Sequence, residues 1–233
     1  MTITPDLTIR VFTNDQYVLD KVFYNNFYRV KVLPENSVVV DVGAHVGYFT
    51  VASILKGASK VYAFEALSAN FRYLAKNTEF FADKVHLNKS AVLFKDSTLS
   101  LAQPKFKEDG KFFDFNDIEV EPSKDTPSET VPSFTLDSSL AMIPDEKIDL
   151  LKINIGYGEM EMLNNSSKLD RVQTICGEMR NPDTALVSKT IEYLKEKGFE
   201  KSWFAATDEG TEIFIFSRVD VSETFDLYNS NKT

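Results

Sequence analysis

The sequence predicts an α/β fold built on a doubly wound, mostly parallel β-sheet, and three observations lead to this prediction. Residues 38–42 (VVVDV) form a short, almost wholly apolar run rich in β-branched side chains, as in a strand buried on both faces of a parallel sheet. Glycines follow this run at once and precede a stretch with helical apolar spacing. Strand and helix patterns then alternate along the chain, which is typical of a doubly wound sheet.

The following segments continue this alternation. Residues 48–56 predict a helix that Gly57 ends, and residues 60–64 predict the second strand. Ser68 is expected to cap a second helix over 68–78. The remaining expected elements are a strand within 85–93, a strand over 148–155, a short helix through Met160 and Leu163, a strand over 172–176, a helix over 184–197 ended by Gly198, and a strand over 212–217.

The whole chain, residues 1–233, is expected to form a single domain. Its length exceeds the typical domain size of about 100–200 residues, but one layered α/β sheet accommodates such a chain. Residues 1–36 are interpreted as an N-terminal helical or strand extension. Over residues 103–132 the alternation breaks down, and charged residues and prolines separate several phenylalanines. We interpret this segment as an insertion or lid, with an ordered surface loop as the alternative.

Composition and charge exclude several kinds of protein. The net charge is -9 and no basic run is present, so no nucleic-acid partner is expected. A single cysteine, Cys176, excludes an internal disulfide, and with only two histidines no zinc cluster is expected. The first residues lack a basic segment followed by an apolar one, and no long uncharged apolar run occurs. We therefore expect a cytoplasmic protein without a membrane span.

A glycine-containing loop and a later acid suggest a ligand site. The loop Asp41–Gly47 (DVGAHVG) joins the first strand to the first helix, where open α/β sheets bind ligands. Gly43 and Gly47 are expected to allow close approach of a ligand to the backbone. Glu65 follows the second strand, a position from which a carboxylate accepts both hydroxyls of a ribose. Together the two features predict a nucleotide or nucleoside site.

Two other interpretations of the loop fit less well. A dinucleotide site is disfavoured because His45 interrupts the glycine pattern and because Asp41 would repel a pyrophosphate. S-adenosylmethionine carries a sulfonium and an ammonium, so the same acid would attract it. In the remaining alternative, the acid and the glycines only form turns.

A family resemblance is carried by the motifs VVVDVGAHVGYFT, KVYAFEA and TLDSSL with IDLLKINIGYGEMEML. Over residues 17–217 the chain resembles the FkbM family of S-adenosylmethionine-dependent methyltransferases. The family pattern DVGAxxG is matched in full, with His45 in a slot that often holds Asn. The resemblance implies the class I methyltransferase (Rossmann-like) fold, S-adenosylmethionine as cofactor, and Glu65 on its ribose. It also implies that the residues around the methionine portion are Asp41, Gly43, Ala44, His45 and Gly47.

The later family pattern K-I-D-x-E-G-x-E is altered here. Residues 152–159 read KINIGYGE, so that Asn154 and Gly156 replace the two acids at its centre. A hydroxyl acceptor must lose a proton with a pKa of about 16, and an amide cannot take it. Glu159 and Glu178 are the candidate catalytic bases. The alternatives are a helix N-terminal charge for Glu159 and a solvated surface acid for Glu178.

The sequence therefore predicts a methyltransferase that moves a methyl group from S-adenosylmethionine to an oxygen of a small molecule, sugar or glycan. The acceptor pocket is expected at the carboxyl edge of the sheet, bordered by residues 103–132 and 180–182. One alternative is a donor-binding protein that has lost catalysis. Another, less favoured by the acidic charge, is an RNA methyltransferase.

Overall fold

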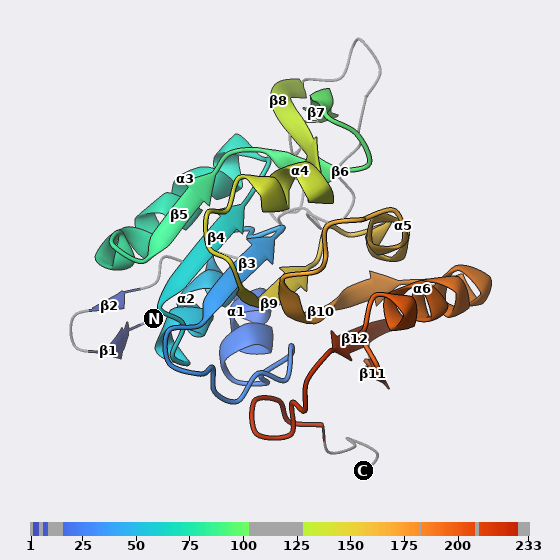
Figure 1. The fold of residues 1–233 in the computed structure, drawn as a ribbon. Helices are drawn as coiled ribbons and strands as arrows, with labels where there is room; N and C mark the ends of the chain where they lie inside the picture. The colour runs from blue at the N-terminus through green and yellow to red at the C-terminus, as the bar shows by residue number, and fades with distance from the viewer. Residues whose placement is uncertain are drawn as a thin grey trace.

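A seven-stranded, mostly parallel sheet forms the centre of the molecule (Figure 1). The computed structural model describes residues 2–4, 7–8, 16–102, 128–181, 183–207 and 210–227. Along the sheet the strand order is β11-β12-β10-β9-β3-β4-β5. The five strands from β10 to β5 are parallel, and β12 runs antiparallel between β10 and β11. This is the doubly wound arrangement predicted from the sequence.

The elements of the chain have the following bounds. The central sheet contains β3 (Val38–Val42), β4 (Lys60–Phe64), β5 (Val85–Asn88), β9 (Ile148–Ile153), β10 (Val172–Arg180), β11 (Lys201–Ala206) and β12 (Thr211–Ser217). The helices are α1 (Gln16–Phe23), α2 (Tyr48–Leu55), α3 (Ser68–Thr78), the 3-10 helix η1 (Glu79–Phe81), α4 (Leu136–Ala141), α5 (Glu159–Asn164) and α6 (Thr184–Glu196). A small sheet is formed by β6 (Ala91–Leu93), β7 (Ser97–Ala102) and β8 (Ser128–Thr135), and β1 (Thr2–Thr4) pairs with β2 (Leu7–Thr8).

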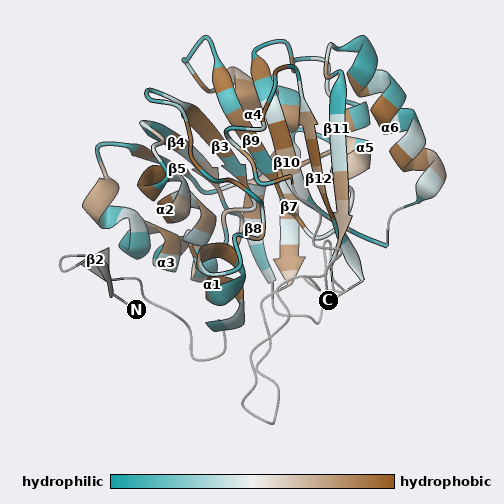
Figure 2. Ribbon diagram, turned by 90° about the horizontal axis from the view of Figure 1, so that it is seen from below, coloured by the Kyte–Doolittle hydropathy of each residue, from teal (hydrophilic) through white to brown (hydrophobic). Residues whose placement is uncertain are grey.

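Helices cover both faces of the central sheet, with α1 to α3 on one face and α4 to α6 on the other (Figure 2). Because side chains alternate along a strand, successive residues enter different cores. Val39 packs with α1 and α2, whereas Val40 packs with the helices of the opposite face. Within the described ranges, no helix is long and apolar enough to cross a membrane.

Most of the expected elements form where the sequence places them, but the expected cap of α3 is wrong. The N-cap residue is Leu67, and Ser68 is the first helical residue. The backbone N–H of Ser68 donates to the Glu129 carboxylate of β8 at 2.8 Å. A carboxylate from a distant strand thus takes the place of a local cap. The ends of two helices are confirmed, since Gly57 and Gly198 have φ of +114° and +90°.

The central part of the chain contains elements that the sequence did not reveal. Residues 128–132, assigned above to an insertion, belong to β8, and residues 103–127 lie outside the described residues. β8 pairs with β6 and β7 in the small sheet, which lies beyond the ends of β3 and β4 (Figure 1). The edge strand β11 was also missed, because its half-exposed residues lack a clear apolar alternation. The expected division into extension, domain and lid stays a prediction.

The centre of the sheet should not tolerate a side chain at Gly177 of β10. A Cβ there would lie 2.2 Å from the carbonyl oxygen of Ile153 and 2.5 Å from the Phe214 ring. Gly177→Ala should lower the free energy of unfolding by about 1–3 kcal/mol, measured by urea denaturation. The exposed control Ser202→Ala should change it by less than about 0.5 kcal/mol. Equal stabilities of the two variants would contradict this packing.

Candidate active site

The predicted site residues gather at one edge of the sheet. The parallel strands β3, β4, β9 and β10 all have their carboxyl ends there. The glycine loop follows β3, Glu65 follows β4, Asn154 follows β9, and the last residues of β10 lie at the same edge. This is the edge at which open α/β sheets bind ligands. The small sheet lies at the same edge (Figure 1).

Glu65 and the glycine loop form one hydrogen-bonded unit. The Glu65 carboxylate is 7% exposed, and its Oε2 accepts the backbone N–H of His45 at 2.9 Å. Its Oε1 accepts the backbone N–H of Leu67 at 2.9 Å and the side-chain amide of Asn70 at 3.3 Å. A carboxylate has about four acceptor positions, two on each oxygen, so that Oε2 retains one for a ligand.

Burial shifts the protonation of both side chains in this unit. Desolvation raises the pKa of Glu65 to about 7, although its three hydrogen bonds oppose the shift. Desolvation, with a smaller contribution from Lys152, lowers the pKa of His45 to about 4. The imidazole of His45 is therefore neutral at neutral pH, whereas Glu65 titrates in the physiological range.

Protein neighbours leave no room for a side chain at the two loop glycines. Gly43 and Gly47 have φ of +75° and +91°. A Cβ at Gly43 would lie 1.9 Å from the backbone oxygen of Asn154, and one at Gly47 would lie 2.8 Å from Leu74. The expectation that these glycines also allow close approach of a ligand stays a prediction. They let the loop lie directly against β9 and α3.

Asp41 points into the protein, which corrects the electrostatic argument made from the sequence. Its carboxylate is fully buried and accepts hydrogen bonds from Lys152 Nζ at 2.9 Å and Thr50 Oγ1 at 2.7 Å. Although burial alone would lower the pKa of Lys152, the adjacent Asp41 raises it above its ordinary value. Because Lys152 neutralises Asp41, the acid does not offer its charge to a sulfonium. Direct contact of Asp41 with a donor stays an untested prediction.

The ammonium of Lys152 also holds the loop itself. Lys152 Nζ donates to the backbone carbonyl of Gly43 at 2.7 Å and to that of Val42 at 3.3 Å. The first carbonyl belongs to the loop, and the second ends β3. Ala44, the next loop residue, is buried, and its N–H donates to the carbonyl of Phe64 at the end of β4. The loop is therefore fixed to β9 and to β4.

A second buried polar network surrounds Asn154 at the end of β9. Asn154 Nδ2 donates to Glu178 Oε2 at 2.8 Å and to Tyr28 Oη at 2.9 Å. Glu178 Oε1 accepts from Lys21 Nζ at 3.2 Å and from Thr211 Oγ1 at 2.7 Å. Glu178 is 3% exposed, which excludes the alternative of a solvated surface acid. Its carboxylate is held by three donors, an arrangement that favours a structural role over that of a base.

Glu159 is turned towards its own loop. Its side chain is 2% exposed, and Oε1 accepts the backbone N–H of Ile155 at 3.0 Å. Desolvation raises the pKa of Glu159 above its ordinary value. This geometry resembles the alternative proposed from the sequence, in which Glu159 serves the start of α5. A catalytic role for Glu159 or Glu178 has no support in these contacts and stays untested.

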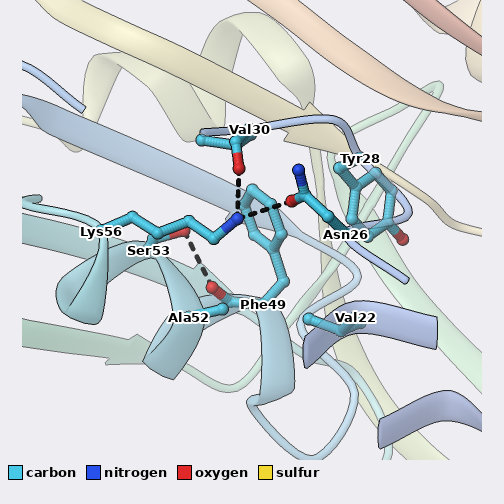
Figure 3. Close-up of a pocket in the computed structure, with 8 residues that line it drawn as sticks. All are labelled: Val22, Asn26, Tyr28, Val30, Phe49, Ala52, Ser53 and Lys56. Carbon is cyan, nitrogen blue, oxygen red and sulfur yellow. Dashed lines mark hydrogen bonds between the residues drawn. The ribbon is translucent and has the colours of Figure 1, made fainter. Parts of the chain in front are cut away.

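Two hollows of the molecule lie away from Glu65. One is lined by Val22, Asn26, Tyr28, Val30, Phe49, Ala52, Ser53 and Lys56 (Figure 3). Lys56 Nζ fills its polar side and bonds Asn26 Oδ1 at 2.5 Å and the carbonyl of Val30 (Figure 3). The other lies between β6, α4 and α5 and is lined by Leu93, Phe94, Thr135, Leu136, Asp137, Met162, Asn165 and Ser166. Neither hollow contains a predicted site residue.

Comparison with known proteins decides the family. The family model described as the methyltransferase FkbM domain matches residues 41–201, which is more than half of the chain. The chain belongs to the FkbM methyltransferase family. The matched region begins at Asp41 and includes the glycine loop, Glu65 and the altered segment 152–159. A search of curated proteins gave no match.

Solved structures share the fold of this FkbM chain. The human methyltransferase 10 domain containing protein has a TM-score of 0.54 at 12% identity, with 92% of this chain and 91% of that chain covered. The delta-N METTL16 MTase domain has a TM-score of 0.53 at 14% identity, with 92% and 90% covered. Methyltransferase FkbM from Methylobacillus flagellatus KT has a TM-score of 0.52 at 12% identity, with 85% and 47% covered. The chain has the class I methyltransferase fold predicted from its sequence.

Several residues of this FkbM site were not identified as site residues from the sequence. Lys152 was noted only as a retained motif residue, although a lysine within the apolar strand IDLLKINI indicates a buried charge that requires a partner. Tyr28, Thr50 and Lys21 carry no sequence signal of their own. Lys21 of α1 and Thr50 of α2 reach the site because these helices cover the face of the sheet on which Asp41 and Glu178 lie, and Tyr28 reaches it from the segment that follows α1.

The buried ion pair should be necessary for the fold. Lys152→Met leaves the Asp41 carboxylate buried without its cation, so the free energy of unfolding should fall by about 3–5 kcal/mol. The double variant Asp41→Asn/Lys152→Met should lose less than the sum of the two single variants. In the pair Lys147–Asp149, whose lysine is exposed, Lys147→Met should cost less than about 1 kcal/mol. Urea denaturation measures the free energy of unfolding of Lys152→Met, Asp41→Asn, the double variant and Lys147→Met. If the losses of the two single variants simply added in the double variant, the pair would not be coupled, and the prediction would be contradicted.

An aspartate at position 154, as in the family pattern, should be destabilising here. Asn154→Asp places a second carboxylate where an amide now donates to Glu178. Repulsion between the new carboxylate at position 154 and that of Glu178 should raise the pKa values at which the two titrate. The loss of stability should be small at pH 5 and grow as the pH rises and both groups ionise, to about 1–3 kcal/mol at pH 8. Denaturation at both pH values tests this, with the exposed Asn36→Asp as control. A loss independent of pH would contradict the predicted repulsion.

Proposed function

We propose that this FkbM protein is an S-adenosylmethionine-dependent methyltransferase whose donor lies between residues 43–47 and Glu65. The observation that carries the proposal is the hydrogen bond between Glu65 Oε2 and the N–H of His45. It joins the acid after β4 to the loop after β3, so that a ribose bound by one lies beside the other. Family membership and fold support the same activity.

Unsatisfied buried atoms beside Glu65 fit a polar ligand. Asn70 is 2% exposed, and its Oδ1 has no hydrogen-bond partner within the part of the chain that the structure describes. Ser90 is 4% exposed, and its Oγ is likewise without a partner. Both residues adjoin Glu65, because Asn70 donates to its carboxylate and the backbone carbonyl of Asn88 accepts from both Glu65 and Ser90. The hydroxyls and amino group of an adenosine would satisfy such atoms.

The acceptor is proposed to be an oxygen of a small molecule. S-adenosylmethionine supplies a methyl group on a sulfonium, and the protein has to orient the acceptor oxygen towards it. A sugar or glycan hydroxyl would also need a base, and both glutamates considered for this task are buried and engaged in hydrogen bonds. A protein that only binds the donor is the alternative, and methyl transfer to any acceptor would exclude it.

Donor binding should depend on the charge of Glu65. Because its pKa is raised to about 7, the carboxylate form that accepts ribose hydroxyls increases as the pH rises from 6 to 8. Affinity for S-adenosylhomocysteine, measured by calorimetry, should therefore rise by up to about tenfold over this range. Glu65→Gln should bind at least about tenfold more weakly at pH 8 and lose the pH dependence.

The exposed variant Glu192→Gln is the matched control for this experiment and should behave as the natural protein. His45 does not contribute to the slope, since its pKa of about 4 lies below the range. Unchanged affinity in Glu65→Gln would remove Glu65 from the site.

A further inference from the structure

The Nε of Arg180, at the carboxyl edge of the sheet, is buried and has no hydrogen-bond partner among the described residues. Arg180 is the last residue of β10, and its side chain as a whole is half-buried. Buried guanidinium groups are normally paired, since an unsatisfied charged donor costs stability. Two arginines at the opposite end of the sheet, Arg171 and Arg218, do have partners, because they donate to backbone carbonyls. Arg180 therefore has the character of a ligand-binding group.

The strand register places Arg180 at the same edge of the sheet as the proposed donor site. The backbone oxygen of Asn154 lies directly against Gly43 of the loop, and its side chain bonds Glu178. Glu178 and Arg180 are two residues apart on one strand and so share a face of the sheet. The Glu178 carboxylate is already taken up by Lys21, Asn154 and Thr211. Glu178 thus lies beside Arg180 in the strand while its charge is used elsewhere.

The altered segment 152–159 removes negative charge from this same edge. Asn154 and Gly156 stand where the family pattern K-I-D-x-E-G-x-E has acids, so the site has two carboxylates fewer. The change removes a base and at the same time reduces repulsion of an anionic acceptor. An acceptor oxygen that is already ionised at neutral pH requires no base.

We propose that the acceptor is a carboxylate, held by Arg180 and methylated on oxygen to give a methyl ester. This inference rests on the proposed function. A carboxylate oxygen attacks the methyl carbon while the carbon–sulfur bond breaks and its electron pair stays on sulfur. The sulfonium becomes a neutral thioether, the carboxylate becomes a neutral ester, and no proton is transferred. A singly charged carboxylate fits one guanidinium, whereas a phosphate dianion is disfavoured in a chain of net charge -9.

The first test identifies the bond that forms without knowledge of the natural acceptor. The full chain is incubated with methyl-tritiated S-adenosylmethionine and the small-molecule fraction of a cell extract. Alkali releases volatile labelled methanol from methyl esters but not from ethers, methylamines or phosphate esters. We expect labelled methanol from the natural protein and from Arg72→Gln, an exposed control that removes the same charge. Arg180→Gln should reduce the label at least about tenfold. Alkali-stable label, or equal methanol from Arg180→Gln, would overturn the proposal.

The second test does not need turnover. The chain is saturated with S-adenosylhomocysteine and titrated in a calorimeter with acetate, succinate and benzoate, each compared with its amide. At least one carboxylate should bind more tightly than its amide and lose about tenfold or more in affinity in Arg180→Gln but not in Arg72→Gln. Absence of this preference overturns the proposal even if the first test yields no label. Failure of S-adenosylhomocysteine itself to bind would instead count against the proposed function.

Discussion

The buried ion pair between Asp41 and Lys152 is the interaction on which the rest of the site depends. It joins two adjacent strands, β3 and β9, on the face of the sheet that α1 and α2 cover. Neither charge is tolerable there alone, because a buried charge without a partner is strongly destabilising. Together they fix an ammonium beneath the loop, and that ammonium binds the carbonyls of Val42 and Gly43. The position of the loop thus follows from the pair.

From this pair, hydrogen bonds extend in two directions along the edge of the sheet. On one side the loop reaches Glu65 through the N–H of His45. On the other side Gly43 packs against the backbone of Asn154, whose amide binds Glu178 and Tyr28. The proposed donor and acceptor sites are therefore held by one connected set of hydrogen bonds and packing contacts. A shift of the loop would move both halves, which is why the geometry of the pair matters for methyl transfer.

The sequence predicted the fold well and placed the glycine loop and Glu65 at one edge of the sheet, because both depend on local patterns, whereas donor binding there stays a prediction. The runs VVVDV and KVYAF coincide with β3 and β4, and the glycine loop and Glu65 follow them directly. Family membership confirmed what these motifs resemble. The small sheet and β11 were missed, since short or exposed strands carry little apolar alternation.

The direction of individual side chains was less accessible from the sequence. Asp41 was expected to face a ligand, yet it faces Lys152, because position 41 shares the face of Val39, which packs against α2. A solvated surface position was the alternative for the candidate base Glu178 because the strand was expected to end at residue 176, whereas β10 continues to Arg180 and is covered by α1. The contacts that orient both side chains join elements far apart in the sequence, which no local pattern encodes.

The most direct test of this account is a crystal structure of the chain with S-adenosylhomocysteine. The account predicts that the ribose lies within hydrogen-bonding distance of Glu65 Oε2, that the methionine portion lies along residues 43–47, and that the sulfur faces the edge between Asn154 and Arg180. The Asp41–Lys152 pair should remain intact beneath the loop. Binding of the nucleoside elsewhere in the chain, or a complex in which Glu65 makes no contact with the ribose, would contradict it.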